Sequence, residues 1–161
     1  MPAGQRLKYR SNIPEYAKYV FEHVDSTFAH HALQNKDKGL ATIIVAGHSY
    51  GQGSSREHAA ICPAYLGIRM VIAKSFERIH TANLINFGIL PLVFVHETDY
   101  DSIQQGNEVV MDDCINQVKQ VQNDTMVVTI NGRAITCKLL ASQRQRAIII
   151  AGGLLNYTKG K

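Results

Sequence analysis

Three apolar runs spaced through residues 40–95 constrain the fold of this 161-residue chain more than any other feature. The first run, LATIIVA at 40–46, is continuous and β-branched, as a strand buried on both faces requires. Two further runs at 68–73 and 89–95 are separated from it and from each other by helical patterns. The order strand, helix, strand, helix, strand predicts a parallel α/β unit with right-handed crossovers.

The helices of this unit are marked by their ends. The first is expected over residues 57–66, with Pro63 starting a second short helix. The next is expected from Ser75 as the N-cap to about Asn86, where Gly88 ends it.

The flanking segments are less regular. Asn12 as a cap and Pro14 in the first turn predict a helix over 11–24, and the polar segment 25–39 reads as a loop. After residue 100 the runs become short, and Asn131-Gly132 is a strong signal for a type I′ hairpin. Ser142 is expected to cap one final helix that reaches Leu155. The short strand-like runs are 108–111, 118–121, 125–130 and 133–139.

Composition indicates a globular protein, with 45% hydrophobic and 19% charged residues, and with the pattern above it predicts one α/β domain over residues 1–161. The net charge is +4, but the basic residues are scattered, tryptophan is absent, and aromatics make up 7%, which argues against nucleic acid. The six basic residues after Asp124 are expected on a solvated helix face and a frayed end. They are Arg133, Lys138, Arg144, Arg146, Lys159 and Lys161.

The cysteines and the N-terminus bear on location and metal binding. Cys62, Cys114 and Cys137 are odd in number and widely spaced, which fits neither a disulfide framework nor a zinc site. They are also too sparse to hold an iron–sulfur cluster within this chain. The N-terminus has no apolar core of a signal peptide, and no apolar run is long enough to span a bilayer. We therefore expect a cytoplasmic protein that makes no membrane contact.

The segment most suggestive of chemistry is Gly51-Gln52-Gly53-Ser54-Ser55-Arg56, between a buried strand and a helix. Backbone N–H groups and the helix dipole favour an anion there, and the guanidinium of Arg56 suits a carboxylate or phosphate. The segment lacks the lysine of a P-loop and the pattern of a nucleophile elbow. Taken by itself, it is as consistent with a plain glycine-rich turn as with an anion site.

A longer match separates these alternatives. Residues 51–60 (GQGSSREHAA) resemble the signature of the C-terminal swivel domain of the aconitase superfamily. The similarity continues through 65–67, 73–92 and 151–155, and upstream through 3–12. It covers nearly the whole chain, most loosely at 25–39 and 96–140. It implies a three-layer swivelling β/β/α domain with a parallel core and an antiparallel part.

The resemblance also implies a reaction. Aconitases interconvert citrate and isocitrate by removing and re-adding water, with a [4Fe–4S] cluster carried by other domains. By this likeness Ser54 is the catalytic serine that takes the proton, and Ser55, Arg56 and Arg10 bind the tricarboxylate substrate. The implied partner is the cluster-bearing part of the enzyme, without which this chain is expected to be inactive. His58 and His80 are expected to be structural histidines with satisfied ring nitrogens.

Of three interpretations, the sequence favours the first, because residues 61–66 and the long match over 74–92 look closer to single-chain aconitase. The first is a C-terminal domain excised from a longer aconitate hydratase, suggested by Met1-Pro2-Ala3-Gly4, which looks like the middle of a family motif. The second is the natural small subunit of a two-chain hydro-lyase, such as isopropylmalate isomerase or homoaconitase. The third, from another class, is an RNA-binding module, which the basic charge permits.

Overall fold

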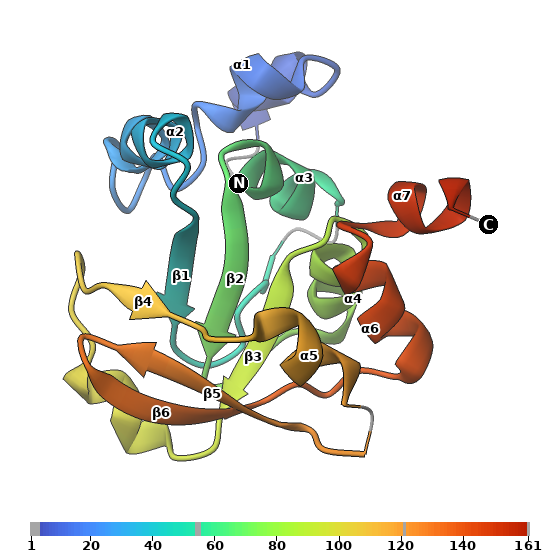
Figure 1. Ribbon diagram of the computed structural model, residues 1–161. Helices are drawn as coiled ribbons and strands as arrows, with labels where there is room; N and C mark the ends of the chain where they lie inside the picture. Colours follow the sequence, from blue (N-terminus) through green and yellow to red (C-terminus); the bar gives the residue numbers. More distant parts are fainter. Residues whose placement is uncertain (1–3, 54–55, 121, 161) are drawn as a thin grey trace.

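The computed structural model describes residues 4–53, 56–120 and 122–160. Its centre is one mixed six-stranded sheet, with three parallel strands continued by three antiparallel ones (Figure 1). The predicted α/β class, with a parallel and an antiparallel part, is confirmed. In sheet order the strands are β1 (Thr42–Ala46), β2 (Ile68–Ala73), β3 (Leu90–Phe94), β6 (Arg133–Lys138), β5 (Thr125–Ile130) and β4 (Val109–Val110).

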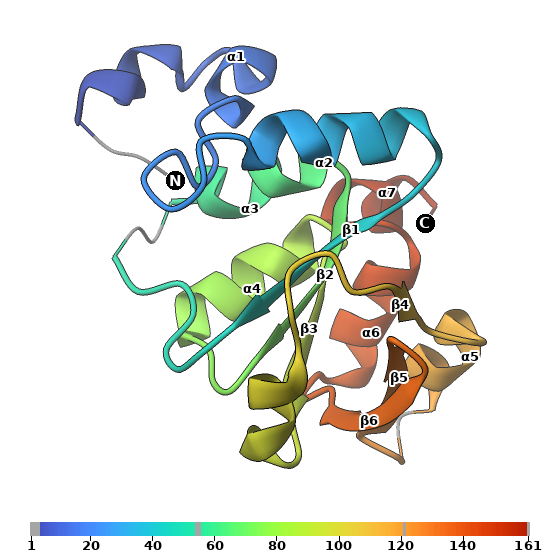
Figure 2. The same ribbon diagram turned by 90° about the vertical axis from the view of Figure 1, so that its left-hand side faces the viewer.

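The two faces of the parallel strands bury different partners. Val71 of β2 belongs to a core formed with the helices, whereas its neighbours Met70 and Ile72 pack into a second core. That second core contains Val128 and Ile135 from the antiparallel strands, which curl across this face (Figure 2). The result is the three-layer β/β/α arrangement. The helices of the first core are α1 (Ile13–Ala17), α2 (Phe28–Asp37), α3 (His58–Tyr65) and α4 (Arg78–Asn86).

Two local signals act as predicted. At the β5–β6 hairpin, Asn131 and Gly132 have φ of 48° and 79°, the left-handed conformations that a type I′ turn requires. Ser142 accepts from Gln145 N while the Gln145 side chain accepts from Ser142 N, which forms a complete capping box for α6 (Gln143–Ile150).

The final helix differs from the prediction because it is two helices. The chain turns at Gly152 and Gly153, both with positive φ, before α7 (Leu154–Lys159) begins. A Cβ at Gly88 would lie 2.5 Å from the Gly152 carbonyl carbon, so close backbone approach fixes this corner.

Four other local predictions are wrong. The segment 25–39 contains α2, since Ala29 and Ala32 are buried on one helical face despite the polar residues around them. The helix expected over 11–24 ends at Ala17 and continues as turns. Pro63 lies inside α3 rather than starting a new helix. Residues 118 and 119 belong to helix α5 (Cys114–Lys119) rather than to a strand.

Arg146 contradicts the expectation of a solvated basic face, since it is only 1% exposed. Its guanidinium donates to the carbonyl oxygens of Val118, Leu139 and Ala141, and to Asp124 Oδ1 at 2.7 Å. These bonds join α6 to the segments on either side of the hairpin. Among the described residues, no helix has the length and apolar character needed to cross a membrane.

Candidate active site

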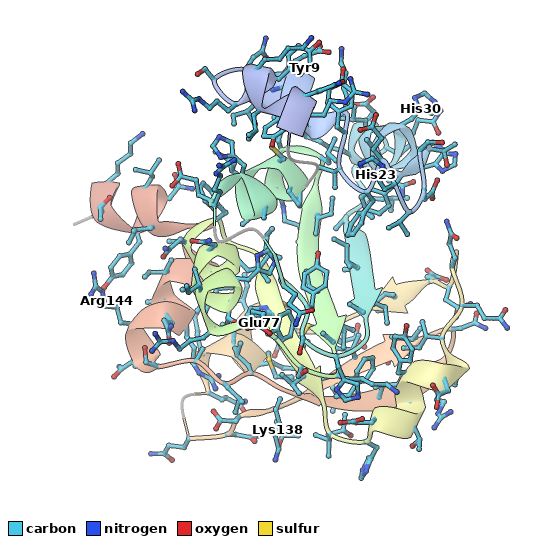
Figure 3. All side chains as sticks on the ribbon, turned by 180° about the vertical axis from the view of Figure 1, so that it is seen from behind. Tyr9, His23, His30, Glu77, Lys138 and Arg144 are labelled. Carbon is cyan, nitrogen blue, oxygen red and sulfur yellow. The ribbon has the colours of Figure 1, made fainter. Side chains whose placement is uncertain are left out.

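The glycine-rich loop, residues 47–56, begins where β1 leaves the sheet. Its first residues are hydrogen-bonded to the segment that follows β2. Tyr50 N donates to Ser75 O and Glu77 N donates to Tyr50 O, both at 2.9 Å, which extends the parallel pairing beyond the strands. Ser49 N donates to Ser75 Oγ at 2.7 Å. The Ser75 hydroxyl therefore binds this loop and does not cap α4. The N-cap of α4 is Glu77, which is labelled in Figure 3.

The middle of the loop is pressed against helix α4. A Cβ at Gly51 would lie 2.3 Å from His80 Cβ and 2.6 Å from His80 Cδ2, so a larger residue does not fit. The Tyr50 ring meets the His80 ring edge-on, with centroids 5.2 Å apart. Gly51 also has a φ of 99°, so both the backbone conformation and the contact with His80 require a glycine here.

His80 departs from the expectation of a satisfied structural histidine. It is 3% exposed, and both ring nitrogens lack a hydrogen-bond partner among the described residues. Burial lowers the pKa of His80 to about 4, so its ring is neutral at pH 7. Sequence reasoning missed this feature because nothing in the local pattern places residue 80 against residue 51.

After Gly51 the described residues Gln52 and Gly53 are exposed. Gly53 has a φ of 106°, and a Cβ placed on it would meet nothing within 4 Å. Ser54 and Ser55 lie outside the described residues. Arg56 is exposed just before α3. The structure thus places one predicted substrate-binding side chain in solvent at the start of this helix.

Arg10 is brought to the same helix from the other end of the sequence. It follows the 3₁₀ turn η1 (Gly4–Tyr9), and its carbonyl oxygen accepts a hydrogen bond from His58 Nε2 at 3.0 Å. The Arg10 side chain is exposed. His58 stands two residues after Arg56, so the backbone of Arg10 lies near the start of α3, close to Arg56 in the chain.

Tyr16 of α1 is buried next to the start of α3. Its ring packs edge-on against His58, with centroids 5.6 Å apart. Burial raises the pKa of the Tyr16 hydroxyl, the neighbouring Cys62 adds to the increase, and the positive charge of Arg56 opposes it. Helix α1 thus connects the segment carrying Arg10 to the segment carrying Arg56 (Figure 1).

Comparison with known proteins decides the family. The aconitase C-terminal domain model matches residues 4–97, which include Arg10 and the whole glycine-rich segment. The chain belongs to the aconitase C-terminal domain family. The matched region ends after β3, so it comprises the parallel half of the sheet and the helices that carry the candidate site.

Relatives of two sizes carry this aconitase-type domain. The chain is 37% identical over 156 residues to the 3-isopropylmalate dehydratase small subunit 2 of Archaeoglobus fulgidus, covering 97% of this chain and 83% of that protein. It is 36% identical over 129 residues to the mitochondrial homocitrate dehydratase of Saccharomyces cerevisiae, covering 76% of this chain. The chain spans only 16% of the length of that second relative.

A solved structure shares the fold. The crystal structure of 3-isopropylmalate dehydratase from Methanocaldococcus jannaschii superposes with a TM-score of 0.67 and 33% identity, covering 92% of this chain and 78% of that one. Both of the relatives described above are named as dehydratases.

The thiols of this aconitase-type domain are not arranged as a cluster site. Cys62 and Cys137 are buried, and burial raises the pKa of Cys62 to about 11 and of Cys137 to about 12, which opposes the thiolate form that iron requires. Over the described ranges, no group of three His, Cys, Asp or Glu side chains could hold a metal ion. The side chains that the structure describes therefore do not fit an iron–sulfur cluster.

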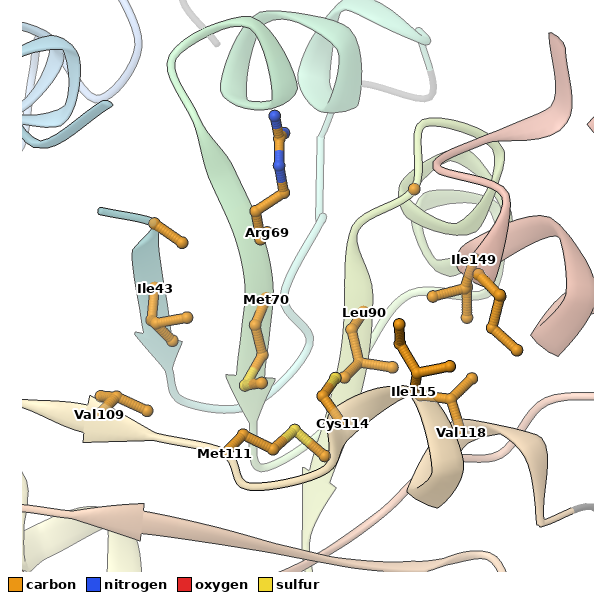
Figure 4. A pocket seen from close by; sticks show the side chains of 13 residues that line it. Ile43, Arg69, Met70, Leu90, Val109, Met111, Cys114, Ile115, Val118 and Ile149 are labelled. Atoms are coloured by element: carbon orange, nitrogen blue, oxygen red, sulfur yellow. The ribbon is translucent and has the colours of Figure 1, made fainter. Parts of the chain in front are cut away.

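An apolar pocket of about 330 Å³ lies near the amino ends of the parallel strands, away from the glycine-rich loop (Figure 4). Its walls include Ile43, Met70 and Leu90 near the amino ends of the parallel strands, and Cys114 and Ile149 across from them. The candidate site lies at the carboxyl ends of these strands, where ligands of open α/β sheets bind. The pocket is therefore separate from the candidate site.

Proposed function

We propose that this chain is the swivel component of a hydro-lyase and works as a small subunit beside a separate, cluster-bearing component. The observation that carries the proposal is the match to an archaeal 3-isopropylmalate dehydratase small subunit, which covers 97% of this chain and 83% of that subunit. A second relative of small-subunit type, the methanogen homoaconitase small subunit, is 39% identical over 117 residues.

In this proposal the chain supplies the groups that hold and deprotonate a substrate with two or more carboxylates. Arg10 and Arg56 each offer a planar fork that binds a carboxylate through two parallel hydrogen bonds. Ser55 adds a hydroxyl, and Ser54 takes the proton next to a carboxylate. A serine is a poor base in water, but the start of α3 and the nearby arginine favour its anionic form.

The cofactor belongs to the partner in this proposal. A [4Fe–4S] cluster held there would supply Lewis acidity toward a hydroxyl group of the substrate. The groups of this chain hold the carboxylates and move the proton. Because the two sets of groups belong to different bodies, substrate has to enter before they close together.

The second candidate is the swivel domain of an aconitate hydratase acting on citrate. It is favoured by the 46% identity over 80 residues to an aconitate hydratase A of Rickettsia bellii, higher than that to the small subunits, although this match covers 49% of the chain. RNA binding has less support because the basic residues are scattered, and Arg146 is buried. The cytoplasmic location stays a prediction from the sequence.

Reconstitution tests both candidates. The chain is mixed anaerobically with the matching cluster-bearing component, iron and sulfide, and turnover of 3-isopropylmalate and of citrate is followed by the absorbance of the unsaturated product. Turnover of 3-isopropylmalate only with both components supports the small-subunit proposal, and turnover of citrate instead supports the second candidate. Turnover of neither substrate refutes both.

Ser54→Ala tests the proposed base in the same reconstituted enzyme. The substitution removes the hydroxyl that accepts the proton and leaves the arginines in place, so KM should stay within about threefold while kcat falls by about 10³-fold or more. Near-normal turnover would remove Ser54 from the reaction.

Arg10→Lys tests the proposed carboxylate clamp. Lysine keeps the charge and loses the two-pronged contact, so KM should rise about tenfold or more with a smaller change in kcat. The hydrogen bond from His58 goes to the backbone of residue 10, so the substitution retains it and leaves the local fold intact. Unchanged kinetics would show that Arg10 does not touch the substrate.

A further inference from the structure

His80 is a buried polar group whose presence is not explained by packing. Leaving a buried donor or acceptor unpaired costs about 1–3 kcal/mol, and both ring nitrogens of His80 are unpaired among the described residues. An apolar ring of similar shape would avoid this cost. An unsatisfied buried group of this kind in a native protein calls for an explanation, such as a role at a functional site.

The position of His80 suggests what that role is. The Cδ2 edge of its ring faces Gly51. Gly51 directly follows Tyr50, which is held by backbone hydrogen bonds, and precedes the exposed Gln52 and Gly53. Nε2 is bonded to Cδ2 and so lies on this same edge of the ring. The rings of Tyr50 and Phe76 pack edge-on, with centroids 5.8 Å apart, and this contact holds Tyr50 in place beside the loop.

The backbone at Gln52 and Gly53 has room to move relative to the rings of Tyr50 and Phe76. Gly53 is exposed, and a Cβ on it would meet no atom within 4 Å, whereas Tyr50 is held by backbone bonds on both sides. A shift of the backbone at residues 51–53 therefore changes which of its polar groups face the His80 ring. Burial keeps that ring neutral at pH 7, so one nitrogen donates and the other accepts.

We propose that His80 is a positioning residue for the site, whose Nε2 forms a hydrogen bond with the backbone of Gly51–Gly53 when a substrate carboxylate binds at the start of α3. The bond holds the backbone of Gly51–Gly53 in the conformation from which Arg56 reaches the substrate. His80 does not touch the substrate. This inference rests on the proposed function, because it assigns a positioning role within the same site.

The test compares variants that keep or remove the polar edge of the ring. His80→Phe keeps a flat ring and removes both nitrogens, and His80→Leu removes them with a different shape. His80→Gln places an amide near the position of Nε2, whereas His80→Asn places one near Nδ1. His30→Phe, at an exposed position on α2, is the matched control for exchanging histidine with phenylalanine.

In the reconstituted enzyme, His80→Phe and His80→Leu should lower kcat about tenfold, the value of one hydrogen bond, with little change in KM. Their urea midpoints should equal or exceed that of the unchanged chain, because two unpaired buried nitrogens are gone. His80→Gln should recover part of kcat, and His80→Asn should not. Unchanged kcat in both apolar variants would overturn the proposal, as would a loss of kcat that simply follows a loss of stability.

Amide hydrogen exchange separates this inference from the proposed function. The rates at Gly51, Gln52 and Gly53 are measured with and without saturating citrate or 3-isopropylmalate, and this needs no turnover. We expect slower exchange with ligand in the unchanged chain and in His30→Phe, and no slowing in His80→Phe. Equal slowing in His80→Phe, or none in the unchanged chain, would overturn the role of His80 even if turnover succeeds. Slowing without turnover of either substrate would instead count against the proposed reaction.

Discussion

Gly51→Ala should be among the most damaging single-methyl changes in this protein, and its cost divides into two parts. The first is backbone strain, since φ of 99° at this position is a conformation that residues with a side chain rarely adopt. Strain of this kind costs about 1–3 kcal/mol. The second is steric, because the new Cβ would lie 2.3 Å from His80 Cβ and 2.4 Å from His80 Cγ. Both atoms belong to the rigid base of a buried side chain, and overpacking there costs about 1–3 kcal/mol more.

Gly53→Ala is the matched control, because it contains the first cost without the second. Its φ of 106° is similar, and its Cβ would meet nothing within 4 Å. The difference between the two variants therefore measures the contact with His80 alone. We expect Gly51→Ala to be less stable than Gly53→Ala by about 2 kcal/mol.

Urea unfolding, followed by circular dichroism, measures this difference. With a slope of about 2 kcal/mol per molar, the midpoint of Gly51→Ala should lie about 1 M below that of Gly53→Ala. Equal midpoints would refute the close approach of Gly51 to His80. They would also remove the geometric basis for a positioning role of His80.

Two further predictions concern buried groups. Arg146→Met should destabilise the chain by about 3–5 kcal/mol in the same assay, because Asp124 and three carbonyl oxygens lose their donor. The control Arg144→Met, on the exposed face of α6, should change stability by less than about 0.5 kcal/mol. Similar losses in both would mean that the guanidinium of Arg146 is not buried. For His80, the folded pKa of about 4 lies below the usual 6.5, so the unfolded chain binds the proton more readily, and stability should fall by up to about 3 kcal/mol as the pH drops from 7 to 4. In unfolding measured across this range, His80→Phe should flatten that part of the pH dependence, and an unchanged slope would contradict the assignment.

The sequence by itself determined the features whose cause is local. Continuous β-branched runs predicted the strands near β1, β2 and β3, since such runs suit strands that are buried on both faces. Asn131-Gly132 predicted its turn because few other residue pairs tolerate two left-handed conformations. The segment 51–60 identified the family because its match is long and carries a specific order of glycine, serine and arginine.

The tertiary structure decided whatever depends on a partner distant in the sequence. Helix α2 forms in a polar segment because packing against the core buries Ala29 and Ala32. Arg146 is buried because the segments around β5 and β6 bring four acceptors to it.

The arrangement of the candidate site was decided in the same way. His58 binds the backbone of Arg10, 48 positions away in the sequence, and α4 places His80 against Gly51. Spacing along the chain carries no record of such contacts, because they come from the packing of helices against the sheet. The sequence therefore predicted which groups bind and react, and the fold determined that the backbone of Arg10 lies near Arg56 and that His80 lies against Gly51.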